Sequence, residues 1–249
     1  MRLDLMSWPE VEEYLSRSTT VIVPIGSTEQ HGPNGLIGTD ALTSDAIAQG
    51  VGNRTETVVS PIISIGMAQH HMAFPGSITL RPSTLIAYVC DYVNSLSRHG
   101  FRQFYFINGH GGNVATLTAA FSELYAQISL GAPNRNCPSI RCGLQNWWAG
   151  DEVKRLSKEL FGSNEGSHAT PSEVSVTYYL FPEAQKRVAM SPTNAPSGRI
   201  YDATSYRSQF PDGRIGSNPA LATVEHGERI FNAAVNDTVA DFKHFDSVT

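Results

Sequence analysis

The sequence predicts an α/β protein, in which layers of helices flank a mainly parallel central sheet. Short apolar, β-rich runs alternate along the chain with longer segments of helical period, which is typical of βα units. Glycine-rich loops with polar side chains follow two of these runs, as at the functional edge of an open parallel sheet. We therefore expect one three-layer domain spanning residues 1–249.

Four strands are expected, each as an apolar run that ends in polar or glycine-rich sequence. They cover Thr20–Ile25, Thr57–Ile65, Gln103–Asn108 and Ser139–Gln145. Helical periodicity predicts five helices beside them, at Pro9–Arg17, Thr43–Gly52, Pro82–His99, Asn113–Leu130 and Asp151–Phe161. After the first helix, strands and helices thus alternate along the chain.

Three further segments complete the prediction. Residues 66–80 contain Phe74-Pro75-Gly76 and are expected to form a loop or hairpin. Residues 191–216 are rich in Pro, Gly, Ser and Arg without a clear period, which predicts a long ordered excursion acting as a lid or subunit contact. Apolar residues recur at near-helical intervals between Pro219 and Phe242, and predict a closing amphipathic helix.

Composition excludes some classes of function. A net charge of -5 and a pI near 5.9 argue against nucleic acid as a partner. No run of 18 apolar residues predicts a membrane span, and the first residues lack the pattern of a secretory signal. The three cysteines, Cys90, Cys137 and Cys142, have no Cys-x-x-Cys spacing and are expected to be small buried hydrophobes. A cytoplasmic protein with a small-molecule substrate is the expectation.

Three candidate metal ligands lie in one glycine-rich loop after the first strand. Glu29, His31 and Asp40 offer two carboxylates and an imidazole, which suit zinc or manganese. The alternative is a solvated polar loop in which Asp40 merely caps the following helix.

A second glycine-rich turn, Asn108–Asn113, follows the strand at 103–108 and places His110 among glycines. Because the carboxyl ends of parallel strands share one edge of the sheet, we expect His110 to meet the first loop as a fourth ligand. A phosphate-binding role is less favoured, since the turn lacks the Lys-Ser/Thr ending of a P-loop.

A third cluster lies at residues 166–175. If Pro171 begins a helix, Glu173 lies in its first turn. There it could either reach a metal or simply stabilise the helix N-terminus with its negative charge. His168 precedes that helix in a loop, and its pKa suits it to carry a proton to a leaving nitrogen. A merely solvated loop histidine is the alternative.

Aromatic residues near the sheet edge are candidates for contact with substrate. Trp147 and Trp148 follow the last strand and could wall a pocket, although core packing or a subunit interface is an equally ordinary role. His71 precedes Phe74-Pro75-Gly76 in a loop, and it too could touch a substrate.

These clusters make the chain resemble the creatininase (creatinine amidohydrolase) family. The resemblance rests on motifs in the family order and at compatible spacing: Glu29–Pro33, Gly38–Asp40, Phe74–Ile78, Asn108–Asn113, His168–Ala169 followed by Glu173, and Gly213–Gly227.

The resemblance implies a layered α/β domain, a homohexamer, and two divalent ions, zinc or manganese, that serve hydrolysis of a C-N bond. Carried over by position, Glu29 and His110 would hold one metal, His31 the other, and Asp40 would bridge them. His168 matches the catalytic histidine of the family.

The chain departs from creatininase itself after His110, where creatininase has a Tyr and a metal-binding Glu and this chain has Gly111 and Gly112. Glu173 is therefore the predicted carboxylate for the second metal. The resulting hypothesis is a metal-dependent amidohydrolase acting on a small cyclic amide, a formamide or a related compound. The alternative from another class is a non-catalytic protein that uses the metal pocket to bind or sense a nitrogenous metabolite.

Overall fold

A parallel sheet forms the centre of the molecule. The computed structural model describes residues 1–131 and 139–247, and within them the sheet has four strands in the order β2-β1-β3-β4. The strands are β1 (Thr20–Ile25), β2 (Val58–Val59), β3 (Gln103–Asn108) and β4 (Arg141–Asn146), and every pairing is parallel. The predicted α/β class is confirmed.

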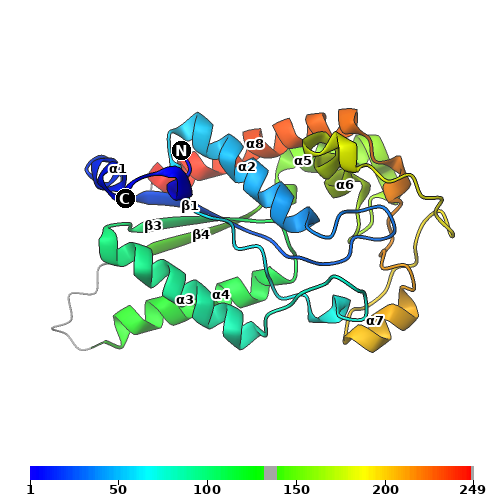
Figure 1. Cartoon of the computed structure of the whole chain (residues 1–249), viewed down its shortest axis with the longest axis horizontal. Coiled ribbons are helices and arrows are strands. Elements are labelled where there is room, and N and C mark those ends of the chain that lie inside the picture. Colours follow the sequence, from blue (N-terminus) through cyan, green and yellow to red (C-terminus); the bar gives the residue numbers. More distant parts are fainter. Residues whose placement is uncertain (132–138, 248–249) are drawn as a thin grey trace.

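Helices cover both faces of the sheet (Figure 1). One layer consists of α3 (Pro82–His99) and α4 (Asn113–Ser129). The other contains α2 (Thr39–Thr55), α5 (Asp151–Phe161), α6 (Pro171–Leu180) and α8 (Val224–Ser247). Smaller helices lie outside these layers: α1 (Trp8–Leu15), α7 (Ala203–Gln209), and 3-10 turns at Leu3–Leu5, Gln69–His71, Trp147–Ala149, Gly162–Asn164, Pro182–Ala184 and Pro219–Leu221.

Side chains of β3 alternate between two separate hydrophobic cores. Phe104 and Phe106 pack into the core shared with α3 and α4, whereas Tyr105 and Ile107 pack into the core shared with α2 and α8. This is the period of two that a strand imposes on its side chains. A strand buried on both faces therefore reads as a continuous apolar run, which is why β1 and β3 have the predicted bounds.

Two predicted elements differ most clearly from the structure. The second strand covers only Val58–Val59 instead of Thr57–Ile65. Pro61 interrupts the run, and beyond it Ile63 forms one isolated parallel bridge with Ile25 of β1. Residues 191–216 are not free of regular structure, since they contain α7. That helix is capped by Asp202, whose Oδ1 accepts hydrogen bonds from the backbone N–H groups of Thr204 and Ser205.

Two of the three cysteines lie among the described residues. Cys90 is buried and Cys142 is half-buried, and neither is in a disulfide. Cys137 lies outside the described residues. Among the described helices, none combines the length and the apolar character that crossing a membrane would require.

The N-terminus of α2 lies against the carboxyl ends of β1 and β3. Helix α2 begins at Thr39, four residues before the predicted start, so Asp40 lies in its first turn. A Cβ atom at Gly109 would come within 2.1 Å of the backbone oxygen of Asp40, and one at Gly26 within 2.4 Å of the nitrogen of Ala41. Only glycine allows this approach, which brings Asp40 to the sheet edge.

We predict that Gly109→Ala destabilises the fold by about 1–3 kcal/mol, because the added methyl group must push α2 away from the sheet. Gly111→Ala is the matched control two residues away. A Cβ there meets nothing within 4 Å, so we expect a change within about 0.5 kcal/mol. Urea unfolding of both variants gives the comparison, and equal stabilities would contradict the packing argument.

Candidate functional site

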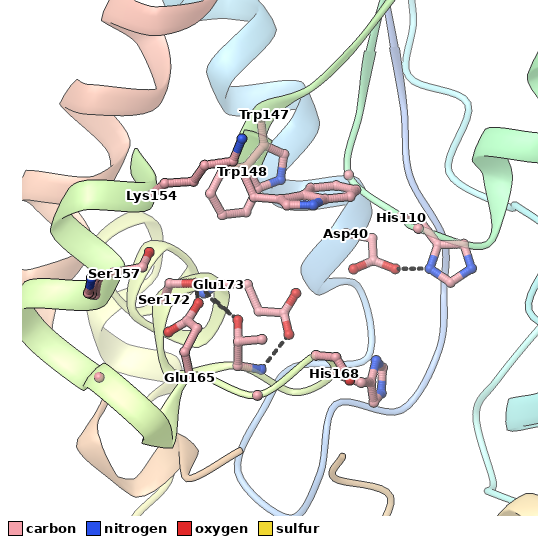
Figure 2. Close-up of a pocket in the computed structure, with 17 residues that line it drawn as sticks. Asp40, His110, Trp147, Trp148, Lys154, Ser157, Glu165, His168, Ser172 and Glu173 are labelled. Atoms are coloured by element: carbon pink, nitrogen blue, oxygen red, sulfur yellow. Dashed lines mark hydrogen bonds and ion pairs between the residues drawn. The ribbon is translucent and has the colours of Figure 1, made fainter. Parts of the chain in front are cut away.

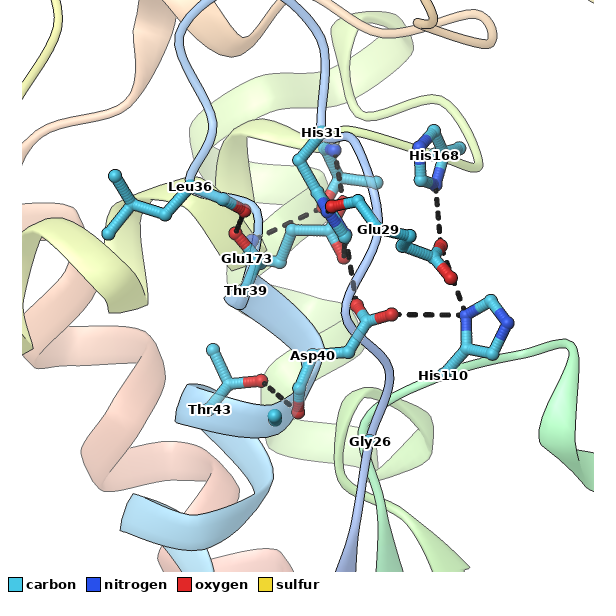
Figure 3. Close-up of polar contacts among 12 residues, drawn as sticks. Gly26, Glu29, His31, Leu36, Thr39, Asp40, Thr43, His110, His168 and Glu173 are labelled. Atoms are coloured by element: carbon cyan, nitrogen blue, oxygen red, sulfur yellow. Dashed lines mark hydrogen bonds and ion pairs between the residues drawn. The ribbon is translucent and has the colours of Figure 1, made fainter. Parts of the chain in front are cut away.

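The predicted metal ligands converge at the carboxyl edge of the sheet (Figure 3). Glu29 and His31 come from the loop after β1, and Asp40 from the first turn of α2. His110 comes from the loop after β3 and Glu173 from the first turn of α6. The first four are buried, and the side chain of Glu173 is 15% exposed.

The ligand atoms form two groups that share Asp40. One group is Glu29, Asp40 and His110; the other is His31, Asp40 and Glu173, and within each the atoms lie within 4.8 Å of one another. Oδ1 of Asp40 lies 2.9 Å from Nε2 of His31, whereas Oδ2 lies 3.1 Å from Nδ1 of His110. The two oxygens of one carboxylate thus face different groups, as a bridging ligand requires.

Backbone carbonyl groups orient the two histidines. Nδ1 of His31 donates to the backbone oxygen of Glu29 at 3.1 Å, and Nε2 of His110 donates to that of Met67 at 3.0 Å. A carbonyl oxygen can only accept, so these nitrogens carry hydrogen. The opposite nitrogen of each ring faces Asp40, and this second contact is typical of metal-binding histidines.

Several acidic oxygens of the cluster lack ordinary partners. Both carboxylate oxygens of Glu29 and Oδ2 of Asp40 are buried without a well-oriented hydrogen bond among the described residues. Oε1 of Glu29 and Oδ2 of Asp40 lie 3.2 and 3.1 Å from Nδ1 of His110, but a buried carboxylate without well-oriented hydrogen bonds is costly. Oxygen and nitrogen donors in these numbers fit zinc or manganese, and a divalent cation would satisfy the orphaned oxygens.

The charges of the cluster shift the pKa values of its histidines. Burial alone would lower the pKa of His31, but the carboxylate of Asp40 raises it to about 10. Burial would also lower the pKa of His110, but Glu29 raises that pKa well above its ordinary value. Burial would likewise raise the pKa of Glu29, yet His110 and His71 hold it well below the usual range. Without a metal, protons on His31 and His110 therefore balance the acids.

Glu173 divides its carboxylate between two roles. Its Oε1 accepts a hydrogen bond of 2.5 Å from the backbone N–H of Thr170, in a capping box at the start of α6. Its Oε2 lies 3.9 Å from Nε2 of His31. Burial raises the pKa of Glu173 to about 7. The helix-terminus role and the predicted metal role are thus compatible, one oxygen serving each.

His168 lies at the edge of the same cluster. Its Nε2 donates to the backbone oxygen of Gln30 at 2.8 Å. Nδ1 lies 3.8 Å from Oε1 of Glu29 and has no hydrogen bond within residues 1–131 and 139–247. Burial, together with His71 and His31, lowers the pKa of His168 well below its ordinary value. The ring is therefore neutral at physiological pH. With Glu29 and His31 it forms a third group whose atoms could hold an ion.

His71, the predicted substrate contact, lies buried behind the ligand Glu29. It does not line the cavity described below; it is buried, with Nε2 3.1 Å from Oε1 of Glu29. The side chain of Gln30, which sequence reasoning passed over, donates to Nδ1 of His71 at 2.9 Å. His71 can then donate its own N–H to Glu29. The available signal was the position of Gln30 between two predicted ligands.

Two further residues missed from the sequence tie the loops together. Asn113 donates to the backbone oxygen of Gly26 at 2.9 Å and accepts from the backbone N–H of Met67 at 3.0 Å. Asn108 donates to the backbone oxygen of His110 at 2.7 Å. Both asparagines are fully buried. Asn113 thus ties the start of α4 to the loops that follow β1 and β2, and Asn108 holds the loop after β3. Both belong to the motif in which only His110 was singled out.

A cavity of about 580 Å³ opens beside the ligand cluster (Figure 2). Trp147, Trp148 and Lys154 lie on one side and Glu165 and Glu173 on the other. Asp40, His110 and His168 lie at one end of it. Trp147 is 1% exposed and meets Trp148 edge to face. Both tryptophans thus line the cavity, and Trp147 is also part of the core.

Glu165 is a cavity residue that the sequence did not suggest. Burial raises its pKa to about 7, and one of its oxygens accepts a hydrogen bond from the hydroxyl of Ser172. Ser172 in turn lies 3.0 Å from the hydroxyl of Thr170, whose backbone binds Glu173. A chain of hydrogen bonds therefore joins Glu165 to the ligand cluster.

Known proteins resemble the chain over nearly all of its length. The family model described as creatinine amidohydrolase matches residues 4–242. The mycofactocin precursor peptide peptidase of Mycobacterium tuberculosis is 31% identical over 242 residues, which cover 90% of this chain and 84% of that protein. The creatinine amidohydrolase of Pseudomonas putida is 27% identical over 250 residues, covering 92% and 91%.

The fold is similar to that of solved creatininase structures. The structure named "Creatininase Mn" superimposes with a TM-score of 0.84 at 21% identity, covering 99% of this chain and 98% of the other. The family model spans the motifs that form the ligand cluster, from Glu29 to Glu173. The chain therefore belongs to the creatininase family.

Proposed function

We propose that this protein is a metal-dependent hydrolase that cleaves the C-N bond of a small amide with water. The observation that carries the proposal is the pair of ligand groups that share Asp40. Glu29 and His110 would hold one ion, His31 and Glu173 the other, and the two oxygens of Asp40 would bridge them. Two divalent ions, zinc or manganese, would polarise the target carbonyl and lower the pKa of a water molecule.

The side chains of the chain provide positioning and proton transfer. His168 is neutral and its Nδ1 has no hydrogen bond in the part of the chain that the structure describes, so it can take a proton from the attacking water and deliver it to the departing nitrogen. The water oxygen then forms the new bond to the carbonyl carbon as the C-N bond breaks. The hydrogen bond from Nε2 of His168 to Gln30 holds the ring in that orientation.

The substrate is proposed only as a class. Relatives are named for a peptide and for creatinine, and both contain a C-N bond next to a carbonyl-type carbon. Cyclic amides, formamides and short peptide amides therefore all belong to the proposed class. A purely binding or sensing protein would have no need of His168, and its position beside the ligands favours the hydrolase.

The oligomeric state, location and partners of the protein are also part of the proposal. We also propose a homo-oligomer, with a hexamer as the prediction that the family resemblance implies, and a cytoplasmic location, as expected from the cysteine spacing. The net charge of -5 supports a small-molecule substrate over nucleic acid.

A screen of lactams, hydantoins, formamides and short peptide amides with zinc- or manganese-loaded protein tests the function directly. We expect hydrolysis of at least one member, with release of an amine. Full activity in a preparation shown by elemental analysis to contain no metal would overturn the proposed chemistry.

Asp40→Ala is predicted to abolish activity far more severely than Trp148→Ala. Loss of an outer partner of a metal ligand typically costs about 10–100-fold in affinity or activity, so loss of a ligand shared by both groups should cost more than about 100-fold. Trp148→Ala only trims a wall of the cavity. Elemental analysis and turnover, measured on both variants, should separate them, and comparable losses would mean that Asp40 is not the bridge.

His168→Ala is predicted to lower turnover by about 10²–10⁴-fold, the usual contribution of a general acid-base group. Its metal content should stay that of the parent protein, because the two groups that share Asp40 do not include it. A parallel loss of metal would instead assign His168 to the ligands, in its group with Glu29 and His31.

Metal affinity is predicted to rise with pH through the neutral range. The pKa of His31 is raised to about 10, so at pH 7 the ring holds a proton that an incoming cation must displace. At lower pH, protons therefore compete more effectively with the cation for the nitrogen of His31. Zinc titration calorimetry in buffers of different ionisation enthalpy should show net proton release at pH 7, and binding without any proton release would contradict the charge balance described above.

A further inference from the structure

Helix α5 presents two lysines to the cavity. Lys154, Ser157 and Lys158 all line it, and their spacing of three and four residues places them on one face of the helix. Both lysines are exposed. The cavity therefore has a positively charged wall, although the protein as a whole carries a net charge of -5.

The two lysines differ from the arginines on and near α5 in having no acidic partner. Arg155 pairs with Glu159 at 3.1 Å, and Glu159 also pairs with Arg229 at 2.8 Å. Within residues 1–131 and 139–247, no carboxylate oxygen lies within 4.0 Å of the ammonium group of Lys154 or Lys158. Like charges four residues apart on a helix repel each other. The charges beside the cavity are thus left uncompensated.

The acids across the cavity are engaged elsewhere. Glu165 accepts a hydrogen bond from Ser172, and Glu173 binds the backbone of Thr170 and faces His31. Neither is within ion-pair distance of the lysines. The tryptophans lie between Lys154 and the pair Asp40 and His110 (Figure 2). An apolar surface therefore separates the positive wall from the ligand cluster.

We propose that the substrate carries an anionic group, a carboxylate in the simplest case, that Lys154 and Lys158 bind while the scissile amide lies at the ligand cluster. The apolar part of the substrate then lies along Trp147 and Trp148. This inference rests on the proposed function, which it narrows to amides that bear a negative charge at some distance from the cleaved bond. Cations beside a cavity favour an anionic ligand both in its approach and when it is bound.

A matched pair of probes isolates the charge. N-formylphenylalanine and its amide, N-formylphenylalaninamide, share the formyl group and the aromatic ring and differ only at the terminal carboxylate. We expect the zinc-loaded protein to bind the acid at least about tenfold more tightly than the amide in titration calorimetry at low salt. This preference should shrink as the ionic strength rises, because the lysines are exposed.

The variants assign the preference to the two lysines. Lys154→Met together with Lys158→Met keeps the aliphatic stems and should bring the ratio of the two affinities close to one. Arg155→Met is the matched control, since Arg155 is on the same helix but does not line the cavity; it should leave the ratio unchanged. Circular dichroism of each variant establishes that the fold is retained.

Three results would overturn the inference. They are equal affinity for both probes, absence of measurable binding of either, and a preference for the acid that survives in the double variant. The last would mean that the carboxylate binds the metal itself. Calorimetry needs no turnover, so these results are separate from the function: hydrolysis of formamides without any charge preference would refute the lysine site and leave the hydrolase intact.

Discussion

The carboxylate of Asp40 is the constraint on which the rest of the site depends. It has one oxygen 2.9 Å from His31 and the other 3.1 Å from His110, so its position determines whether the two ligand groups form one centre. That position follows from backbone packing, since the start of α2 approaches the sheet edge where Gly26 and Gly109 have no side chain. Gly26 and Gly109 thus contribute to the chemistry by letting the backbone of α2 come close to the sheet edge.

A second consequence is electrostatic. Bringing Glu29 and Asp40 into a buried position creates negative charge that has to be balanced. Protons on His31 and His110 balance it in the protein alone, as their raised pKa values show. Divalent ions would compete with these protons for the same nitrogens. The same acids therefore favour a metal and make its binding depend on pH.

The residues around the ligand cluster orient the ligands and do not themselves belong to the two ligand groups that share Asp40. Gln30 holds His168 through its backbone and His71 through its side chain. Asn113 ties the start of α4 to the loops that follow β1 and β2. Such outer contacts fix the orientation of each ring, which a metal centre needs as much as the ligands themselves. The cavity beside the cluster has apolar walls and the lysines of α5. Residues that would select the substrate can therefore lie apart from the residues that would cleave it.

The sequence by itself determined the class of fold, the bounds of β1 and β3, and the convergence of the ligand loops, because apolar runs and glycine-rich turns are local patterns with a known geometry. It was wrong for the second strand and for residues 191–216, where Pro61 and the cap at Asp202 outweighed the wider pattern. The family resemblance already implied that Asp40 lies between both ligand groups. Only the tertiary structure decided that His71 lies behind Glu29, and that Lys154 and Lys158 line the cavity. These facts depend on contacts between residues distant in the chain, and no local periodicity encodes the direction in which a side chain points across such a contact.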